Sequence, residues 1–197
     1  MSRAAVLFMA IVALIGTYYA ARHIDELVTR PDALPVIESL GGDFTLPATS
    51  GGTVSLQQFR GRLVLLNFGY TSCPDVCPTV LARMRQLLLG LGDAATGVQP
   101  LFVTIDPSRD TLDVLKPYLE YFHPAFIGLS GTEEQTRAAA DPFKVYYVRE
   151  SERENGYDFT HSDRIYLIDR QGRVRATFAA YTTDDEMLAI TRQLLAE

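Results

Sequence analysis

Two cysteines in one short segment are the residues of this chain best suited to chemistry. They are Cys73 and Cys77, in the segment Cys-Pro-Asp-Val-Cys-Pro, and the 197 residues contain no other cysteine. An apolar stretch precedes them and a helical pattern follows, so they lie where a helix N-terminus lowers the pKa of a thiol. A single thiol pair in that position is typical of redox chemistry or of binding a soft metal ion.

The spacing of the two thiols bears on this choice. Residues four apart on a helix have Cβ atoms about 5–6 Å apart, whereas a disulfide needs about 3.5–4.5 Å. The loop can curl to close the gap, so Cys73 and Cys77 could also form a redox-active disulfide. A metal fits the looser spacing better, because bonds near 2.3 Å hold two sulfurs farther apart than an S–S bond of about 2.05 Å. Soft thiolates in a site of low coordination number select Cu(I).

A third metal ligand would come from elsewhere in the chain, and we consider its three histidines. His23 belongs to a segment of prolines and mixed charge, and His123 lies in a loop after a predicted helix. His161 directly precedes a predicted strand that runs to Ile168. In a thioredoxin-like fold the loop before this strand lies against the active cysteines. Position alone leaves His161 open between a metal ligand and a surface or cap residue.

The elements predicted around these residues are those of an α/β fold. Continuous apolar runs predict buried strands at 63–68 and 101–105, and a repeat of helical period predicts a helix at 79–91 between them. Other patterns predict a hairpin at 44–46 and 54–56, helices near 110–122, 132–140 and 183–196, a solvated loop or hairpin tip at 149–154, and strands at 165–168 and 174–178. This order predicts a thioredoxin-like fold with an extra N-terminal β-hairpin and an inserted helix. The cysteines follow the carboxyl end of a strand, where open α/β sheets place ligands.

An uncharged run from Ala4 to Ala21 predicts an N-terminal transmembrane helix. As a helix it spans roughly 27 Å, against a hydrocarbon core of about 30 Å. Cleavage as a signal peptide would put a tyrosine where a small residue is needed, which favours an uncleaved anchor. We therefore expect a membrane anchor at 1–22, a linker at 23–40 and a globular domain at 41–197.

The bulk properties exclude several classes of protein. The net charge of −6 argues against a nucleic-acid partner. Two cysteines are too few for a disulfide scaffold, and no second Cys or Cys/His pair completes a tetrahedral zinc site. Nothing of size precedes the predicted anchor, and no Arg/Ser-rich transit segment comes first. We therefore expect a single-pass protein of the bacterial inner membrane, with its soluble domain in the periplasm.

Four motifs in a fixed order resemble those of one known family. Residues 69–79, Gly-Tyr-Thr-Ser-Cys-Pro-Asp-Val-Cys-Pro-Thr, resemble the copper-site motif of the Sco/SenC family, assembly factors for the copper centre of cytochrome c oxidase. Three further segments are similar to other signatures of that family: Val-Thr-Ile-Asp-Pro-Ser-Arg-Asp-Thr at 103–111, Gly-Leu-Ser-Gly-Thr at 128–132, and His161-Ser162 followed by Ile-Tyr-Leu-Ile-Asp at 165–169. The likeness extends from about Gly42 to Leu195.

The resemblance implies that Cys73, Cys77 and His161 bind copper, as Cu(I) or Cu(II). It also implies that Asp106 lies near the site, either behind the ligands or in partner recognition; the alternative is that Asp106 caps the turn after a strand. The implied function is that of a membrane-anchored copper chaperone. Its partner would be subunit II of cytochrome c oxidase or another copper donor or acceptor protein.

Two other functions stay open, and two more are disfavoured. A thiol–disulfide reductase that keeps the oxidase copper-site cysteines reduced needs the same fold, and a redox sensor is a further alternative. A general oxidoreductase is disfavoured because the spacing is Cys-x-x-x-Cys and because no proline after Pro142 can supply the cis-proline that faces the cysteines in thioredoxins. A peroxiredoxin needs Thr or Ser where Pro74 stands and Pro where Tyr70 stands.

Overall fold

The computed structural model describes residues 11–18, 33–150 and 156–197. The chain divides into two compact units, residues 1–33 and 34–197. In the first unit, residues 11–18 form a helix with exposed side chains. Within the described part of the chain, no helix is both long and apolar enough to cross a membrane. The rest of the predicted anchor and the first part of the predicted linker lie outside the described residues.

The second unit is built on one five-stranded sheet. Its strand order is β5 (Ile127–Leu129), β4 (Val98–Thr104), β3 (Leu63–Gly69), β8 (Ile165–Ile168) and β9 (Val174–Phe178). The first three strands are parallel, and β8 and β9 run antiparallel to their neighbours. Every residue of the central strand β3 is buried, which accounts for its continuous apolar run. A parallel βαβ unit followed by an antiparallel hairpin is the predicted thioredoxin-like arrangement.

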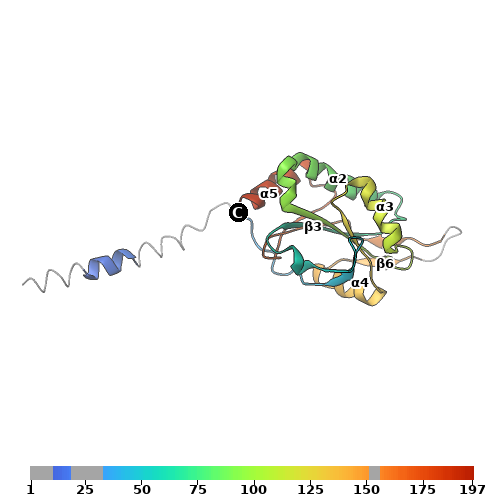
Figure 1. Ribbon diagram of the computed structural model, residues 1–197, viewed down its shortest axis with the longest axis horizontal. Coiled ribbons are helices and arrows are strands. Elements are labelled where there is room, and N and C mark those ends of the chain that lie inside the picture. The colour runs from blue at the N-terminus through green and yellow to red at the C-terminus, as the bar shows by residue number, and fades with distance from the viewer. Residues whose placement is uncertain (1–10, 19–32, 151–155) are drawn as a thin grey trace, which may run out of the picture. The chain divides into compact units, whose positions relative to one another are not determined.

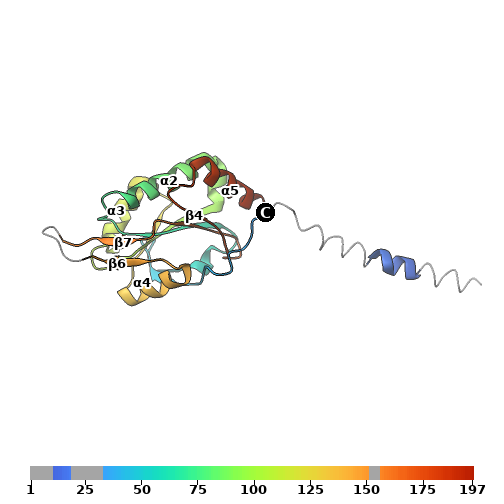
Figure 2. The same cartoon turned by 180° about the vertical axis from the view of Figure 1, so that it is seen from behind.

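The sheet lies between two layers, which Figures 1 and 2 show from opposite sides. One face is covered by three helices: α2 (Val76–Leu91), α3 (Leu112–Phe122) and α5 (Asp184–Ala196). Because successive side chains of a strand point to opposite faces, Leu63 and Leu65 pack against these helices, while Val64 and Leu66 pack into the core on the other side.

The opposite face carries the predicted additions to the fold. A hairpin of β1 (Thr45–Pro47) and β2 (Thr53–Ser55) is followed by the short 3-10 helix η1 (Leu56–Phe59). The inserted helix α4 (Glu133–Ala140) begins at a capping box in which Thr132 and Gln135 exchange hydrogen bonds, as the sequence predicts. The 3-10 helix η3 (Asp141–Phe143) completes this layer, and a further one, η2 (Gly92–Gly97), joins α2 to β4.

Several elements differ from their predicted form. Helix α2 begins at Val76 rather than at Thr79, so Pro78 lies inside the first turn, where a backbone N–H is still not needed. Strand β5 was not predicted. Nor were β6 (Tyr147–Arg149) and β7 (Phe159–His161), which form a separate antiparallel two-stranded ribbon. The predicted solvated segment 149–154 begins at the last residue of β6, and residues 151–155 lie outside the described part.

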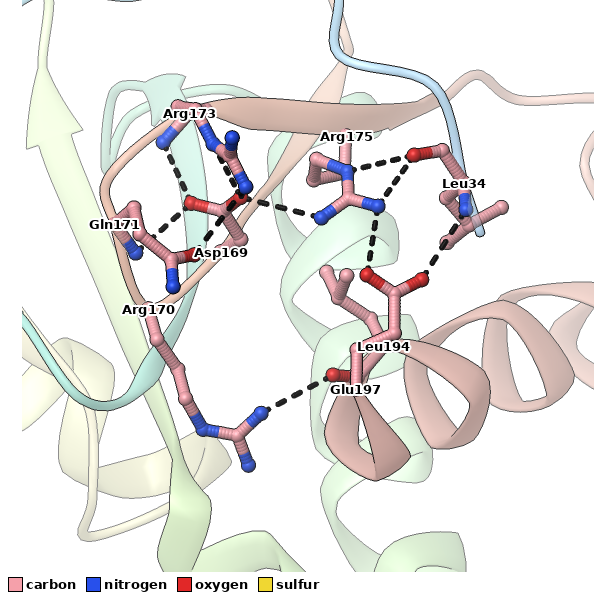
Figure 3. A network of polar contacts seen from close by, with 8 residues as sticks. All are labelled: Leu34, Asp169, Arg170, Gln171, Arg173, Arg175, Leu194 and Glu197. Carbon is pink, nitrogen blue, oxygen red and sulfur yellow. Dashed lines mark hydrogen bonds and ion pairs between the residues drawn. The ribbon is translucent and has the colours of Figure 1, made fainter. Parts of the chain in front are cut away.

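A polar cluster marks where the chain enters the second unit (Figure 3). The Leu34 carbonyl accepts a hydrogen bond of 2.9 Å from Nε of Arg175. The same guanidinium pairs with Asp169 at 3.2 Å and with Glu197 at 2.7 Å. Asp169 directly follows β8, and Glu197 directly follows α5. This cluster therefore joins both chain ends of the unit to the sheet. Figures 1 and 2 place this end of the unit opposite the β6–β7 ribbon.

Candidate metal centre

The joint between β3 and α2 positions the two cysteines. After β3 ends at Gly69, a loop leads to the N-cap residue Asp75. Cys77 is in the first turn of α2 and is 1% exposed, whereas Cys73 lies in the loop and is half-buried. The backbone N–H of Cys77 donates to Sγ of Cys73 at 3.4 Å. One of the unpaired N–H groups of the helix N-terminus therefore points at the more accessible sulfur.

The loop is held by a carboxylate from the next strand–helix connection. The buried Asp110 accepts hydrogen bonds from the Thr71 backbone at 2.9 Å and from the Thr104 hydroxyl at 2.6 Å. The Thr71 hydroxyl donates to the same carboxylate. Burial is the main cause that raises the pKa of Asp110. Asp110 thus ties the cysteine loop to the end of β4, a structural role consistent with its complete burial.

The β6–β7 ribbon brings His161 to the cysteines across a long stretch of sequence. His161 is the last residue of β7 and pairs with Tyr147 of β6. Its Nε2 lies 3.4 Å from Sγ of Cys77. Its Nδ1 lies 2.8 Å from the Ser162 carbonyl oxygen, which can only accept a hydrogen bond. Nδ1 therefore carries the proton, and the Nε2 lone pair faces the sulfurs, as in a histidine ready to bind a metal.

The three candidate ligand atoms lie close enough to share one ion. The sulfurs of Cys73 and Cys77 and a ring nitrogen of His161 are all within 4.8 Å of one another. Two sulfurs on one ion can lie up to about 4.6 Å apart at zinc-like bond lengths, so ligand atoms gathered this closely are suited to sharing one ion. Two thiols and an imidazole are the donor set that suits copper. Among the described residues, no other group of three Cys, His, Asp or Glu side chains comes together in this way.

The neighbouring groups separate the pKa values of the two thiols. A hydrogen bond from Cys77 is the main cause that lowers the pKa of Cys73, to about 3; burial opposes this effect and His161 adds to it. The hydrogen bond to Cys73, together with burial, raises the pKa of Cys77. Burial is the largest single effect on His161 and lowers its pKa, but the hydrogen bonds to Cys73 and Ser162 and the charges of Cys73 and Asp163 together outweigh burial, so the net pKa is raised. At neutral pH the pair therefore carries one negative charge, on Cys73.

Two residues beside the site were not singled out by the sequence. The Tyr70 ring contacts the His161 ring edge-on, with 5.6 Å between centroids, and its hydroxyl accepts a 3.4 Å hydrogen bond from the Phe159 backbone. A Cβ atom on Gly69 would lie 2.7 Å from Sγ of Cys77. Both residues fall within the motif around the cysteines, but their roles depend on packing between distant segments, which the motif alone does not reveal.

Neither of the other two residues that the sequence analysis considered and the structure describes, His123 and Asp106, is part of the three-ligand group. His123 ends helix α3 and accepts a hydrogen bond of 3.2 Å at Nδ1 from the Ala125 backbone, whereas His23 is outside the described residues. Asp106 is 2% exposed. Its carboxylate accepts hydrogen bonds from Arg109, Ser108 and Tyr157 and is not part of the three-ligand group.

The three-ligand group opens into a hollow of about 330 Å³, lined also by Pro74, Val76 and Thr160. Pro74, Val76 and Thr160 are exposed. An ion held by Cys73 and His161 would therefore be accessible from this side, while Cys77 closes the site from the core side. Such an arrangement is suited to exchanging an ion with another protein, in contrast to a closed structural metal site.

The fold and the site together define a thioredoxin-like protein with a two-thiol, one-imidazole centre at the end of its central strand. The model of the SCO1/SenC family matches residues 34–196, and the chain belongs to that family. The SCO2-like protein of Rickettsia felis is 41% identical over 151 residues, which cover 76% of this chain and 74% of that relative.

Solved structures agree with this assignment. The structure of Bradyrhizobium japonicum ScoI with copper bound is 35% identical in sequence with a TM-score of 0.73, over 79% of this chain and 99% of that one. The structure of yeast Sco1 with copper bound is 30% identical with a TM-score of 0.74, over 81% of this chain and 90% of that one. The family that the motifs predicted is thus confirmed.

Proposed function

We propose that this protein is a membrane-anchored copper chaperone that carries one copper ion on Cys73, Cys77 and His161. The observation that carries the proposal is the convergence of two sulfurs and an imidazole nitrogen within 4.8 Å. Membership of the SCO1/SenC family supports copper as the ion, because the relatives from Bradyrhizobium japonicum and yeast were solved with copper bound.

In this proposal the ion is cargo, and the ligands hold it in an exchangeable form. Cys73 contributes a thiolate that already exists at neutral pH, Cys77 gives up its proton on binding, and neutral His161 supplies Nε2. Three ligands leave room for an incoming thiolate or imidazole of the acceptor at the hollow, so the ion passes by stepwise ligand exchange. A Cys73–Cys77 disulfide has no thiolate to offer, so oxidation of the pair prevents loading.

The acceptor in this proposal is subunit II of cytochrome c oxidase, a choice supported by the likeness of the four motifs to those of oxidase assembly factors. Residues 1–22 anchor the protein in the bacterial inner membrane, residues 23–40 link the anchor to the domain 41–197, and the domain faces the periplasm. The uncharged run from Ala4 to Ala21 supports the anchor in this proposal.

Anaerobic copper titration of the reduced full chain tests the proposal. The wild type should bind one equivalent of Cu(I), and Cys73→Ser and Cys77→Ser should each abolish tight binding. His161→Ala should weaken Cu(II) binding and change its spectrum. His123→Ala is the matched control, because His123 lies at the end of α3 and is not part of the ligand group. If His161→Ala behaves like His123→Ala, His161 is not a ligand.

A thiol–disulfide reductase is a second candidate, favoured by the difference between the two thiols. The half-buried Cys73, whose pKa is lowered to about 3, would attack one sulfur of a substrate disulfide and release the other as a thiol. Cys77 would then lose its proton, attack Cys73 and free the substrate's second thiol, so that the substrate is reduced and this protein oxidised. Rapid reduction of oxidised glutathione by the copper-free protein, lost in Cys73→Ser, would favour this function over copper delivery.

A further inference from the structure

The strand that carries His161 depends on contacts outside its own sheet. Strands β6 and β7 form a ribbon of three residue pairs that joins no other strand in the described part of the chain. Two-stranded ribbons of this kind are marginally stable by themselves. Something must therefore hold the ribbon against the main sheet if Nε2 of His161 is to stay 3.4 Å from Sγ of Cys77.

Tyr157, two residues before β7, is held between two cationic side chains. The guanidinium carbon of Arg149, the last residue of β6, lies 3.5 Å from the Tyr157 ring centroid. The guanidinium carbon of Arg109, in the loop after β4, lies 3.9 Å from the same centroid. Cation–π contacts of this length are favourable, more so where they are partly desolvated. The ring thus joins the ribbon to a loop of the main sheet.

Hydrogen bonds fix the same tyrosine at its hydroxyl and at its backbone. The Tyr157 hydroxyl donates to Oδ1 of Asp106 at 2.8 Å and lies 2.8 Å from the Ser108 hydroxyl. Arg109 donates to the Tyr157 carbonyl at 2.9 Å and forms an ion pair with Asp106. Asp106 is 2% exposed and follows the end of β4, so the anchoring group is itself rigidly held. Asp106, Arg109 and Tyr157 together are called the tyrosine clamp below.

Aromatic contacts connect the tyrosine clamp to the metal ligand. The Tyr157 ring packs edge-on against Phe159, with 5.7 Å between centroids. Phe159 packs in the same way against Tyr70, at 5.3 Å, and Tyr70 against His161, at 5.6 Å. The rings of Phe159 and Tyr70 therefore connect Tyr157 to the imidazole, so a displacement of Tyr157 should also move His161.

We propose that the tyrosine clamp positions His161: Asp106 and Arg109 hold Tyr157, and Tyr157 holds the β6–β7 ribbon so that the imidazole stays on the copper ion. The inference rests on the proposed copper site and assigns the clamp residues a role in setting how firmly the third ligand binds. The two thiols lie on the β3–α2 joint, outside the ribbon. Opening the clamp should therefore affect the imidazole ligand and spare the thiolates.

The test compares Cu(II) and Cu(I) binding by full-length Tyr157→Leu and wild type. The variant should still bind one equivalent of Cu(I), which two thiolates can hold. Its Cu(II) affinity should fall about 10- to 100-fold, as when residues that orient a metal ligand are removed. Its electron paramagnetic resonance spectrum should lose nitrogen coupling and approach that of His161→Ala. Tyr121→Leu is the control, because Tyr121 is 84% exposed on α3 and lies outside these contacts.

Two milder variants separate the clamp from a general loss of folding. Tyr157→Phe keeps the ring between the guanidiniums and loses the hydroxyl's hydrogen bonds with Asp106 and Ser108. Arg109→Lys keeps the charge but not the paired hydrogen bonds to Asp106 and the Tyr157 carbonyl. Each should show a smaller loss of nitrogen coupling than Tyr157→Leu, with Cu(I) binding intact. The inference is overturned if Tyr157→Leu keeps the nitrogen coupling of the wild type. It is also overturned if Tyr157→Leu no longer binds Cu(I) while both milder variants keep the nitrogen coupling of the wild type. If the wild type itself shows no nitrogen coupling, the proposed copper site fails, and the clamp fails with it.

Discussion

Cys73 and Cys77 have the same side chain but different surroundings. Cys77 is buried in the first turn of α2, where its thiol donates to Cys73 and where burial disfavours its ionised form. Cys73 is half-buried in the loop and receives hydrogen bonds from the Cys77 thiol and backbone. The pair is therefore prepared to hold one negative charge, with the second charge appearing only when an ion arrives.

Selective alkylation at acid pH should reveal this difference between the thiols. Because the pKa of Cys73 is lowered to about 3, its thiolate persists as the pH falls from 7 to 5, while Cys77 stays protonated over the same range. Iodoacetamide added to the reduced, metal-free protein at pH 5 should therefore modify Cys73 and leave Cys77 intact, as mass spectrometry of tryptic peptides would show.

Cys77→Ala serves as the control for this experiment. It removes the main hydrogen bond that lowers the pKa of Cys73, so alkylation of Cys73 at pH 5 should slow. Equal modification of both cysteines in the wild type, with a midpoint near the ordinary thiol value of about 8.5, would contradict the difference between them.

At the scale of elements, the site is a meeting of β3, α2 and the β6–β7 ribbon. Strand β3 and helix α2 come close at Gly69, where an added Cβ would lie only 2.7 Å from the Cys77 sulfur. Because no positive φ angle is found at Gly69, the glycine is required for space and not for backbone conformation. The close packing of strand and helix places the Cys77 sulfur against the end of β3.

Gly69→Ala should therefore disturb both stability and the metal site. The added methyl would lie 2.7 Å from Sγ of Cys77 and 3.1 Å from the Phe102 ring, and overpacking of this kind costs about 1–3 kcal/mol. Urea unfolding of the full chain should show this loss, and copper titration should show weaker binding because Cys77 must move.

Gly90→Ala provides the matched control for crowding. A Cβ there meets only the flexible Leu188 side chain, at 3.2 Å, and alanine favours the helical backbone of α2 by about 1 kcal/mol. Its stability should equal or exceed that of the wild type. An unchanged midpoint and copper affinity in Gly69→Ala would mean that the strand and helix can separate without cost.

The sequence predicts an element well when the contacts that stabilise that element are local in the chain. Strand β3 is apolar throughout because both of its faces are covered, and α4 begins at a capping box, so each has a clear local pattern. Strands β6 and β7 have none, because cation–π contacts to Tyr157 and packing on Tyr70 hold them in place. The cysteines could be found from their own motif, whereas the geometry of His161 depends on this non-local packing.

At the scale of the whole molecule, the chain enters the second unit far from the candidate site. The cluster of Leu34, Asp169, Arg175 and Glu197 lies at the end of the sheet where β3 begins, and the cysteines follow the end of β3. A strand of this length spans about 20 Å. The candidate site therefore lies at the opposite end of β3 from the residues at which the chain enters this unit.

The carboxylate of Asp169 is central to this cluster and makes its strength depend on pH. Burial alone raises the pKa of Asp169, but hydrogen bonds from Arg173 and Arg175 outweigh it, and the net pKa is lowered. A carboxyl whose pKa is lower in the folded state stabilises the fold above its unfolded pKa of about 3.9. That contribution is lost as the pH falls through the lowered folded value.

Asp169→Asn should remove this contribution and most of its pH dependence. Asp169 is 3% exposed and Arg175 is 6% exposed, so the loss at pH 7 should be about 3 kcal/mol, the low end of the range for a broken buried ion pair, because Glu197 still faces Arg175. Urea unfolding of the full chain at several pH values should give stabilities of variant and wild type that converge below about pH 4.

Asp184→Asn is the control. Asp184 is 58% exposed in its ion pair with Arg83, and removal of this ion pair should cost less than about 1 kcal/mol. A constant difference between Asp169→Asn and wild type from pH 7 to pH 3 would show that the charge of Asp169 does not hold this end of the molecule together.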